Sequence, residues 1–300
     1  MIQPRHSPGT AFAVGTVGIA LFSGMDAVMK GLVLAIGVYS TMLWRSFVGV
    51  GMSGIGYGVS WKRWPTRKVL RMHIERGVLT SFMGLLFFWG IGHVPLAQAI
   101  ALAFIAPLIA LYLASVLLGE KVGKRTIGAS LLAFVGVIVI FVGQARADLG
   151  REALLGSVAI LASAVLYALN IIMMRRQSQV AGPLEIAFFQ NLTVSAVLLL
   201  GVPLVGIALP AAEHWPDLLL AALLSTVSLL LLSWAYARAE ASYLAATEYT
   251  SFLWAALFGW LVFGEHLSAF TLAGAGLIVA GCLLAARTPH AANPHLEAAP

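Results

Sequence analysis

Charged residues are scarce in this sequence of 300 residues, where Asp, Glu, Lys and Arg together make up 10%. Soluble domains carry roughly 25% of these residues, whereas here 60% of the chain is hydrophobic and the mean hydropathy is +0.94. This composition excludes a soluble globular protein. Cysteine is nearly absent, and the single Cys282 excludes both an internal disulfide framework and a cysteine-built zinc or iron–sulfur centre.

Catalytic and nucleotide-binding motifs are also missing. No H-E-x-x-H, G-x-S-x-G or P-loop string occurs, and the 7 histidines are scattered. We therefore expect no enzyme, no bound metal, no cofactor and no ATP-driven motor. The net charge of +6 does not indicate a nucleic-acid partner, because the basic residues form short clusters between the apolar segments. We call these clusters basic collars.

Long apolar runs make up most of the chain. A bilayer core needs roughly 20 apolar residues per helix, and runs such as 218–233 are apolar all round rather than alternating. We expect an all-α membrane protein of ten transmembrane helices in a lipid bilayer, followed by a disordered cytoplasmic tail at 287–300. The predicted spans are 10–30, 36–59, 72–92, 95–118, 126–143, 153–174, 183–205, 217–237, 242–263 and 269–286.

The two halves of the chain repeat each other. A shift of 145 residues aligns them without a gap, which predicts one five-helix repeat at 10–143 and another at 153–286. Because five crossings are an odd number, the second repeat is inverted in the membrane. The aligned pairs include Lys30 with Arg175, Arg45 with Gln190, Trp89 with Trp234, and Gly119-Glu120 with Gly264-Glu265.

The distribution of basic residues agrees with this inversion. The loop 61–71 carries five Lys or Arg residues, and its counterpart 206–216 carries none. With both termini in the cytoplasm, 14 of the 18 Lys and Arg residues face the cytoplasm, as the positive-inside rule favours. We therefore expect a multi-pass protein of the cytoplasmic (inner) membrane with both termini inside. Inverted repeats around a central site are typical of secondary transporters, since each half can adopt the other's conformation.

Several features are shared with a known family. They are the five-plus-five architecture, Arg45 in the second span, the two Gly-Glu pairs, and Pro107 about a dozen residues before the first pair. Over residues 10–286 the chain resembles the EamA-type ten-helix members of the drug/metabolite transporter (DMT) superfamily. The resemblance implies an exporter of small metabolites working by alternating access, most like amino-acid exporters of the YddG (aromatic amino-acid exporter) type. Phe252 occupies the position equivalent to Pro107, so a matching kink in the ninth span is not predicted.

Candidate site residues are aromatic or polar groups at membrane depth. Tyr167 and Asn170 are spaced i, i+3 and therefore share one helix face. An arginine in mid-span is costly unless it faces protein or water, which makes Arg45 a candidate gating or anion-binding group. The predicted substrate-binding residues are Phe82, Phe104, Tyr167, Asn170, Ser228 and Tyr249. The gating or charge-partner candidates are Arg45, Gln190, Trp89, Trp234 and Glu248.

The remaining charged groups have structural interpretations. Asp26 and Lys30, spaced i, i+4, are expected to pair within one helix, which favours facilitated transport without an obligatory ion. Glu120 and Glu265 are expected to stabilise the N-terminal ends of the fifth and tenth spans. Alternatives to an amino-acid exporter are an exporter of drugs or hydrophobic cations bound by Glu248, an intramembrane enzyme, and a passive channel. The partner is a small molecule, and a monomer is expected, with a dimer left open.

Overall fold

The computed structural model describes residues 8–60, 64–118, 124–146, 150–207, 209–236 and 247–286. This part of the chain folds into helices joined by short turns and contains no strand. The expected tail at 287–300 and the Gly119-Glu120 pair lie outside the described residues. The helices are α1 (Pro8–Ile36), α2 (Val38–Ser60), α3 (Arg67–Ile91), α4 (Leu96–Ala103), α5 (Ala106–Leu118), α6 (Lys124–Arg146), α7 (Gly150–Ser178), α8 (Pro183–Val205), η1 (Ala212–His214), α9 (Trp215–Tyr236), α11 (Ser251–Phe263) and α12 (Ala269–Ala286).

These helices form the ten-helix, two-repeat membrane fold that the sequence predicts. Five stretches are long and apolar enough to cross a membrane, namely Gly9–Ile36, Arg67–Ile91, Gly150–Ser178, Pro183–Val205 and Ala212–Leu232. Shorter apolar helices cover the remaining predicted spans apart from the second, which α2 occupies. The fourth span is divided into α4 and α5, and α11 forms the second part of the ninth span.

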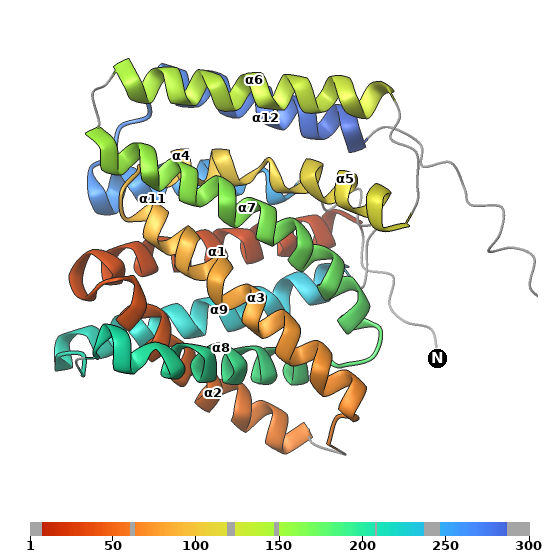
Figure 1. Cartoon of the computed structure of the whole chain (residues 1–300), viewed down its shortest axis with the longest axis vertical. Coiled ribbons are helices and arrows are strands. Elements are labelled where there is room, and N and C mark those ends of the chain that lie inside the picture. The colour runs from red at the N-terminus through yellow and green to blue at the C-terminus, as the bar shows by residue number, and fades with distance from the viewer. Residues whose placement is uncertain are drawn as a thin grey trace, which may run out of the picture.

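The repeat is visible in how the helices pack. In Figure 1, α6 lies along α12, and α1 packs on α9 as its repeat counterpart α7 packs on α3. The helices alternate in direction, so the bundle has two ends. We call the end with the last turn of α1 and the start of α4 the Lys30 end, which is on the left of Figure 1. The opposite end, with the start of α3 and the last turn of α7, is the His73 end.

Glycines bring α6 and α12 into backbone contact. A Cβ atom at Gly136 would lie 2.6 Å from the carbonyl oxygen of Gly274, and one at Gly274 would lie 2.5 Å from that of Gly136. Cβ atoms do not occur this close to a carbonyl, so any side chain at either position forces the helices apart. Close backbone approach through small residues is the usual way in which membrane helices gain packing contacts.

Gly136→Ala is therefore expected to destabilise the protein. The added methyl group overpacks the α6–α12 contact, which costs about 1–3 kcal/mol of unfolding free energy. The matched control is Gly128→Ala on the same helix, where a Cβ atom meets nothing within 4 Å. Thermal unfolding of the purified protein in detergent measures both variants. Equal unfolding temperatures for the two variants would contradict this account of the contact.

Candidate functional site

The fourth span is broken at Phe104 and Ile105, between α4 and α5. In a continuous helix the N–H of Leu108 would donate to the carbonyl of Phe104, but here it donates to Ile105 at 3.1 Å. The freed carbonyl of Phe104 instead accepts a hydrogen bond from the Cys282 thiol at 3.1 Å. Pro107 contributes to the break because it has no N–H to donate.

The ninth span is broken at the equivalent position, Tyr249 and Thr250. The N–H of Leu253, the counterpart of Leu108, donates to the carbonyl of Thr250 at 3.0 Å. No proline is involved, and the sequence did not predict this kink. Its physical cause is local, because the hydroxyls of Thr250 and Ser251 each donate at 2.6 Å to a carbonyl three residues earlier. Hydroxyl groups of this kind compete with the regular helix ladder and bend it.

The two breaks face each other. The rings of Phe104 and Tyr249 lie 5.4 Å apart at an angle of 78°, an edge-to-face contact. These residues are equivalent under the 145-residue shift, so their contact lies where the two repeats meet. Two of the predicted substrate-binding residues, one from each repeat, are thus brought together.

Tyr167 of α7 is an exposed aromatic residue that lies near charged groups of three other spans. It is 43% exposed and interacts electrostatically with Glu248 of the ninth span, Arg76 of α3 and Asp26 of α1. Glu248 directly precedes the second helix break and is itself exposed. An aromatic ring with a hydroxyl group is thus influenced by charges of both signs.

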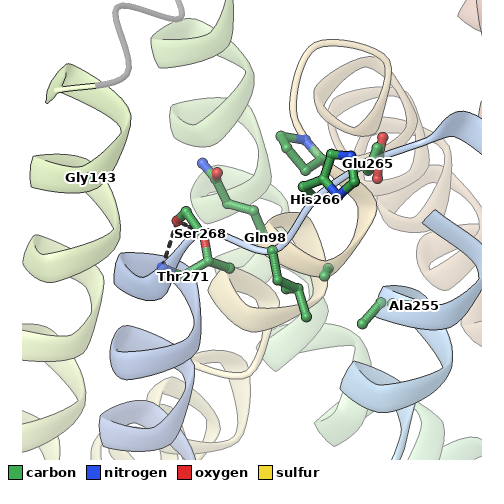
Figure 2. Close-up of a pocket in the computed structure, with 11 residues that line it drawn as sticks. Gln98, Gly143, Ala255, Glu265, His266, Ser268 and Thr271 are labelled. Atoms are coloured by element: carbon green, nitrogen blue, oxygen red, sulfur yellow. Dashed lines mark hydrogen bonds between the residues drawn. The ribbon is translucent and has the colours of Figure 1, made fainter. Parts of the chain in front are cut away.

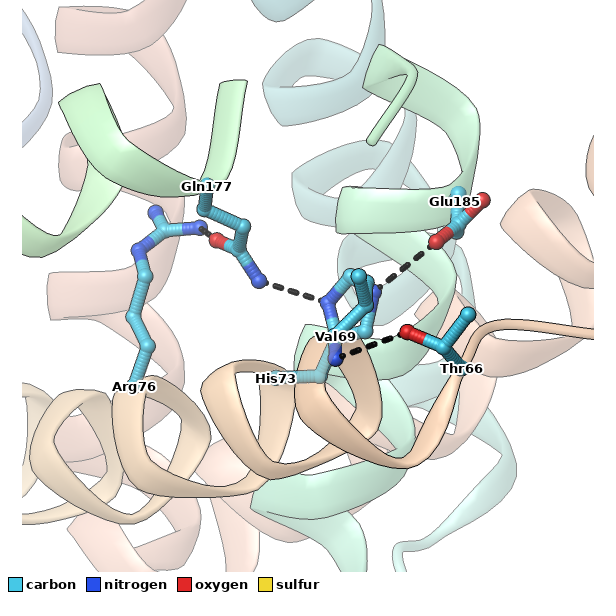
Figure 3. Close-up of polar contacts among 6 residues, drawn as sticks. All are labelled: Thr66, Val69, His73, Arg76, Gln177 and Glu185. Atoms are coloured by element: carbon cyan, nitrogen blue, oxygen red, sulfur yellow. Dashed lines mark hydrogen bonds and ion pairs between the residues drawn. The ribbon is translucent and has the colours of Figure 1, made fainter. Parts of the chain in front are cut away.

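A chain of polar side chains runs from this region to the His73 end (Figure 3). Arg76 donates from Nε to Asn170 Oδ1 at 2.8 Å and from its terminal nitrogen to Gln177 Oε1 at 2.7 Å. Gln177 Nε2 lies 2.5 Å from His73 Nδ1, and His73 Nε2 lies 3.0 Å from Glu185 Oε1. We call Arg76, Asn170, Gln177 and His73, all buried, the Arg76 cluster. It places Asn170 against a guanidinium, next to Tyr167 on the same helix face.

Arg76, Gln177 and His73 are not predicted from the sequence as site residues. Arg76 is one of the 14 Lys and Arg residues assigned to the cytoplasmic side, although it lies nine residues beyond the start of α3. A signal was present, because His73 and Arg76 are spaced i, i+3, and Asn170 and Gln177 are spaced i, i+7. Both spacings place polar groups on one face of an otherwise apolar helix.

Lys30 does not pair with Asp26, contrary to expectation. Its ammonium group donates to the carbonyl of Val94 at 2.7 Å and to the carboxylate of Glu265. Asp26 is buried, and its Oδ1 atom has no hydrogen-bond partner among the described residues. The opposite charge that acts on Asp26 is that of Arg45, whose Nε atom is buried and likewise without a partner in that part of the chain.

Glu265 also stabilises a different helix from the one expected. Its Oε2 atom accepts a hydrogen bond from the backbone N–H of Leu96 at 2.7 Å, at the N-terminus of α4. The N-terminus of α12 is capped instead by Ser268, whose hydroxyl accepts from the N–H of Thr271 at 2.9 Å. Lys30, Val94, Leu96 and Glu265 thus join α1, the start of α4 and the α11–α12 turn, and we call them the Lys30 latch. The ring of Phe263 lies 5.2 Å from the ammonium group.

The other predicted site residues are spread over the bundle. Ser228 is buried and donates to the carbonyl of Gly18 at 2.8 Å, which ties α9 to α1. Phe82 is 55% exposed and belongs to an apolar stripe on α3 with Ile74 and Val78, so it is not brought to the Phe104–Tyr249 contact. Gln190, Trp89 and Trp234 are partly buried on α8, α3 and α9. The ring of Trp89 lies against that of His93 near the Lys30 end, with centroids 4.3 Å apart and planes tilted by 35°.

A small cavity of about 150 Å³ lies at the Lys30 end (Figure 2). It is lined by apolar groups and by Gln98, Glu265, His266, Ser268 and Thr271, and its lining includes none of the six predicted substrate-binding residues. Ligand sites are usually about 300–1,000 Å³, so this cavity is smaller than a typical ligand site. Among the described residues, no group of three or more His, Cys, Asp or Glu side chains is placed to hold a metal ion.

Comparison with known proteins accounts for this architecture. The model of the EamA-like transporter family matches the chain twice, at residues 10–142 and 154–287. The chain belongs to the EamA-like transporter family. It is therefore a membrane transporter of the drug/metabolite transporter superfamily and not an enzyme. A crystal structure of a protein 20% identical in sequence aligns with a TM-score of 0.60 over 94% of this chain and 100% of the other, which shows a shared fold.

Individual relatives are named as transporters of different small molecules. The pseudopaline exporter CntI of Pseudomonas aeruginosa is 27% identical and covers 89% of this chain and 92% of its own length. A riboflavin transporter of Rhizobium johnstonii is 30% identical over 72% of this chain and 70% of its own. An S-adenosylmethionine uptake transporter of Rickettsia bellii is 26% identical over 71% of each. These names support a metabolite transporter, and they do not single out the aromatic amino-acid exporters.

Proposed function

We propose that this EamA-like transporter exports small zwitterionic metabolites, most of all neutral and aromatic amino acids, by alternating access. The observation that carries the proposal is the contact between Phe104 and Tyr249 at two repeat-equivalent helix breaks. Broken helices of inverted repeats form substrate sites in secondary transporters, because the breaks free backbone groups at membrane depth. The site is then shared by both repeats, which exchange conformations around it.

The chemistry beside the breaks suits a solute with both charges and an apolar body. The rings of Phe104 and Tyr249 provide apolar walls, and Tyr167 lies among Glu248, Asp26 and Arg76. An amino acid presents an ammonium group, a carboxylate and a side chain, which match acidic groups, a guanidinium and aromatic rings. One relative is named as an exporter and another as an uptake transporter. Export is therefore proposed from the sequence resemblance and from the first of these relatives.

The basic collars orient the protein in the inner membrane. The positive-inside rule assigns the His73 end to the cytoplasm, because residues 61–71, which run into the start of α3, carry five Lys or Arg residues. The Lys30 end then faces outward, where the Lys30 latch joins α1, the start of α4 and the α11–α12 turn.

Single cysteines test this sidedness. In a Cys282→Ser background, cysteines at Lys68 and Lys124 are expected to react with a membrane-impermeant maleimide only from the cytoplasmic side, and one at Glu213 only from outside. Intact cells and inside-out vesicles give the two measurements. Labelling of all three positions from the same side would contradict the inverted arrangement in the membrane.

The function itself is tested with purified protein in liposomes. Counterflow of labelled L-phenylalanine, L-leucine, a sugar and a hydrophobic cation is measured, and saturable exchange of the two amino acids is expected. Exchange of the cation with no movement of either amino acid would overturn the proposal in favour of a drug exporter using Glu248. Currents that do not saturate would indicate a passive channel instead.

A further inference from the structure

The Arg76 cluster is a polar junction between α3 of the first repeat and α7 of the second, and the equivalent positions of α9 and α1 are apolar. Under the 145-residue shift, the positions equivalent to its four residues are occupied by Met25, Leu32, Leu218 and Ala221. All four are buried, at 0–2% exposure, in the packing of α1 on α9. At these four positions the fold therefore builds the equivalent helix junction with apolar side chains alone. Packing alone does not explain why Arg76, His73, Asn170 and Gln177 are present.

Arg76 is a buried cation held by neutral groups. Its side chain is 6% exposed, and its two hydrogen-bond acceptors are the amide oxygens of Asn170 and Gln177. The ion pairs found in the described part of the chain are Lys30–Glu265, Arg71–Glu75, His73–Glu185 and His214–Glu213, and none includes Arg76. Burying a charge without a counter-charge is costly. Such a residue in a membrane span is usually kept for function.

The guanidinium is also fixed in orientation. Gln177 is in contact with His73, and His73 with Glu185, so the acceptor that holds Arg76 is itself held (Figure 3). An arginine side chain carries five N–H donors in a planar fork that fits a carboxylate with two parallel bonds. The bonds to Asn170 and Gln177 account for two of these donors. A rigid, preoriented fork binds a ligand with little loss of side-chain entropy.

An exposed residue lies one helical turn from the partner of this guanidinium. Tyr167, which is 43% exposed, shares a face of α7 with Asn170, Asn170 bonds to Arg76, and Tyr167 interacts electrostatically with Arg76. Tyr167 is also influenced by the charges of Glu248 and Asp26. A cation and two acidic groups thus act on one aromatic residue, and a zwitterion carries the two matching charges.

We propose that Arg76 binds the carboxylate of the transported solute, with Tyr167 beside it and the Arg76 cluster holding the guanidinium in place. The inference rests on the proposed function and narrows the substrate class to carboxylate-bearing solutes. The second repeat offers Ala221 at the equivalent position, so the guanidinium is supplied by the first repeat alone.

The test compares an acid with its amide in liposomes containing the full-length protein. Counterflow of labelled L-phenylalanine is competed with unlabelled L-phenylalanine and with L-phenylalaninamide, which lacks the carboxylate. Wild-type protein is expected to prefer the acid. Arg76→Gln is expected to weaken binding of the acid about 10- to 100-fold, because a charge-assisted pair is lost, and to leave binding of the amide unchanged. Arg76→Lys keeps the charge without the fork and is expected to fall in between.

Arg71→Gln is the matched control, because it removes the same charge from an exposed position of the same helix. It is expected to retain the full preference for the acid. A purely structural role of Arg76 would lower binding of acid and amide alike and leave their ratio unchanged. An unchanged acid-to-amide ratio in Arg76→Gln overturns the inference and leaves the proposed function standing. If Arg76→Gln does not fold, the same ratio is measured in Arg76→Lys.

The two proposals fail in different ways. If wild-type protein carries another carboxylate but no amino acid, and Arg76→Gln loses that transport, the amino-acid proposal falls and the role of Arg76 is supported. If wild-type protein exchanges only cations that lack a carboxylate, both proposals fall.

Discussion

Replacing Glu265 with Gln is expected to lower the unfolding free energy by about 3–5 kcal/mol, the range for breaking one side of a buried ion pair. The substitution leaves the Lys30 ammonium group buried without its counter-charge, since Lys30 is 5% exposed and its remaining bond in the latch is to the carbonyl of Val94. It also replaces the carboxylate that accepts from the N–H of Leu96. Thermal and denaturant unfolding in detergent measure the loss.

A double-mutant cycle isolates the latch from other effects. Lys30→Met combined with Glu265→Gln is expected to cost less than the sum of the single changes, because the double variant leaves no unpaired buried charge. The control cycle uses Arg71 and Glu75, an exposed i, i+4 pair, where a coupling of about 0.3–0.5 kcal/mol is expected. Additive effects at Lys30 and Glu265 would show that the latch contributes no specific pairing.

Phe104→Ala and Tyr249→Ala are each expected to reduce transport sharply while the protein still folds and inserts. Each removes one of the two rings that meet at the paired helix breaks, and loss of one substrate contact of roughly 1–3 kcal/mol corresponds to about a 5- to 150-fold loss of affinity. Because the residues are repeat-equivalent, losses of similar size are expected. Tyr167→Ala is expected to act in the same direction. Counterflow in liposomes at several substrate concentrations measures the effect.

Trp64→Ala is the control for this set. Trp64 lies before α3 and is 65% exposed, and its ring centroid is 6.0 Å from that of Phe189. The substitution therefore also removes a large aromatic ring. Transport by the Trp64→Ala variant is expected to change little. Normal transport by the Phe104 and Tyr249 variants together with loss of activity in folded Trp64→Ala would place the substrate site elsewhere.

Much of the site was accessible from sequence because the duplication constrains it. An offset of 145 places Phe104 and Tyr249 at equivalent positions, and the sequence predicts that both bind substrate. It does not predict the kink in the ninth span, because Phe252 occupies the position of Pro107. The hydroxyls of Thr250 and Ser251 bond to nearby carbonyls and break the helix without proline. The adjacent hydroxyl residues Thr250 and Ser251 in mid-span are the sequence signal for this helix break.

Charge partners could not be read from sequence. The i, i+4 spacing of Asp26 and Lys30 is sufficient for a pair on an isolated helix, but Lys30 pairs with a residue 235 positions away. That choice depends on where the α11–α12 turn approaches α1 in the folded bundle. In the same way, Arg76 looked like part of a basic collar until Asn170 and Gln177 were found against it.

The sequence by itself determined the ten helices, their inverted duplication and the absence of catalytic motifs. These are local properties or simple arithmetic, because a bilayer requires long apolar helices and an odd number of spans per repeat inverts the second copy. Only the tertiary structure decided which buried charges meet, which helix Glu265 stabilises and which of two equivalent junctions is polar. Those outcomes depend on contacts between distant helices, because a buried polar group can pair only with a partner that packing brings within reach.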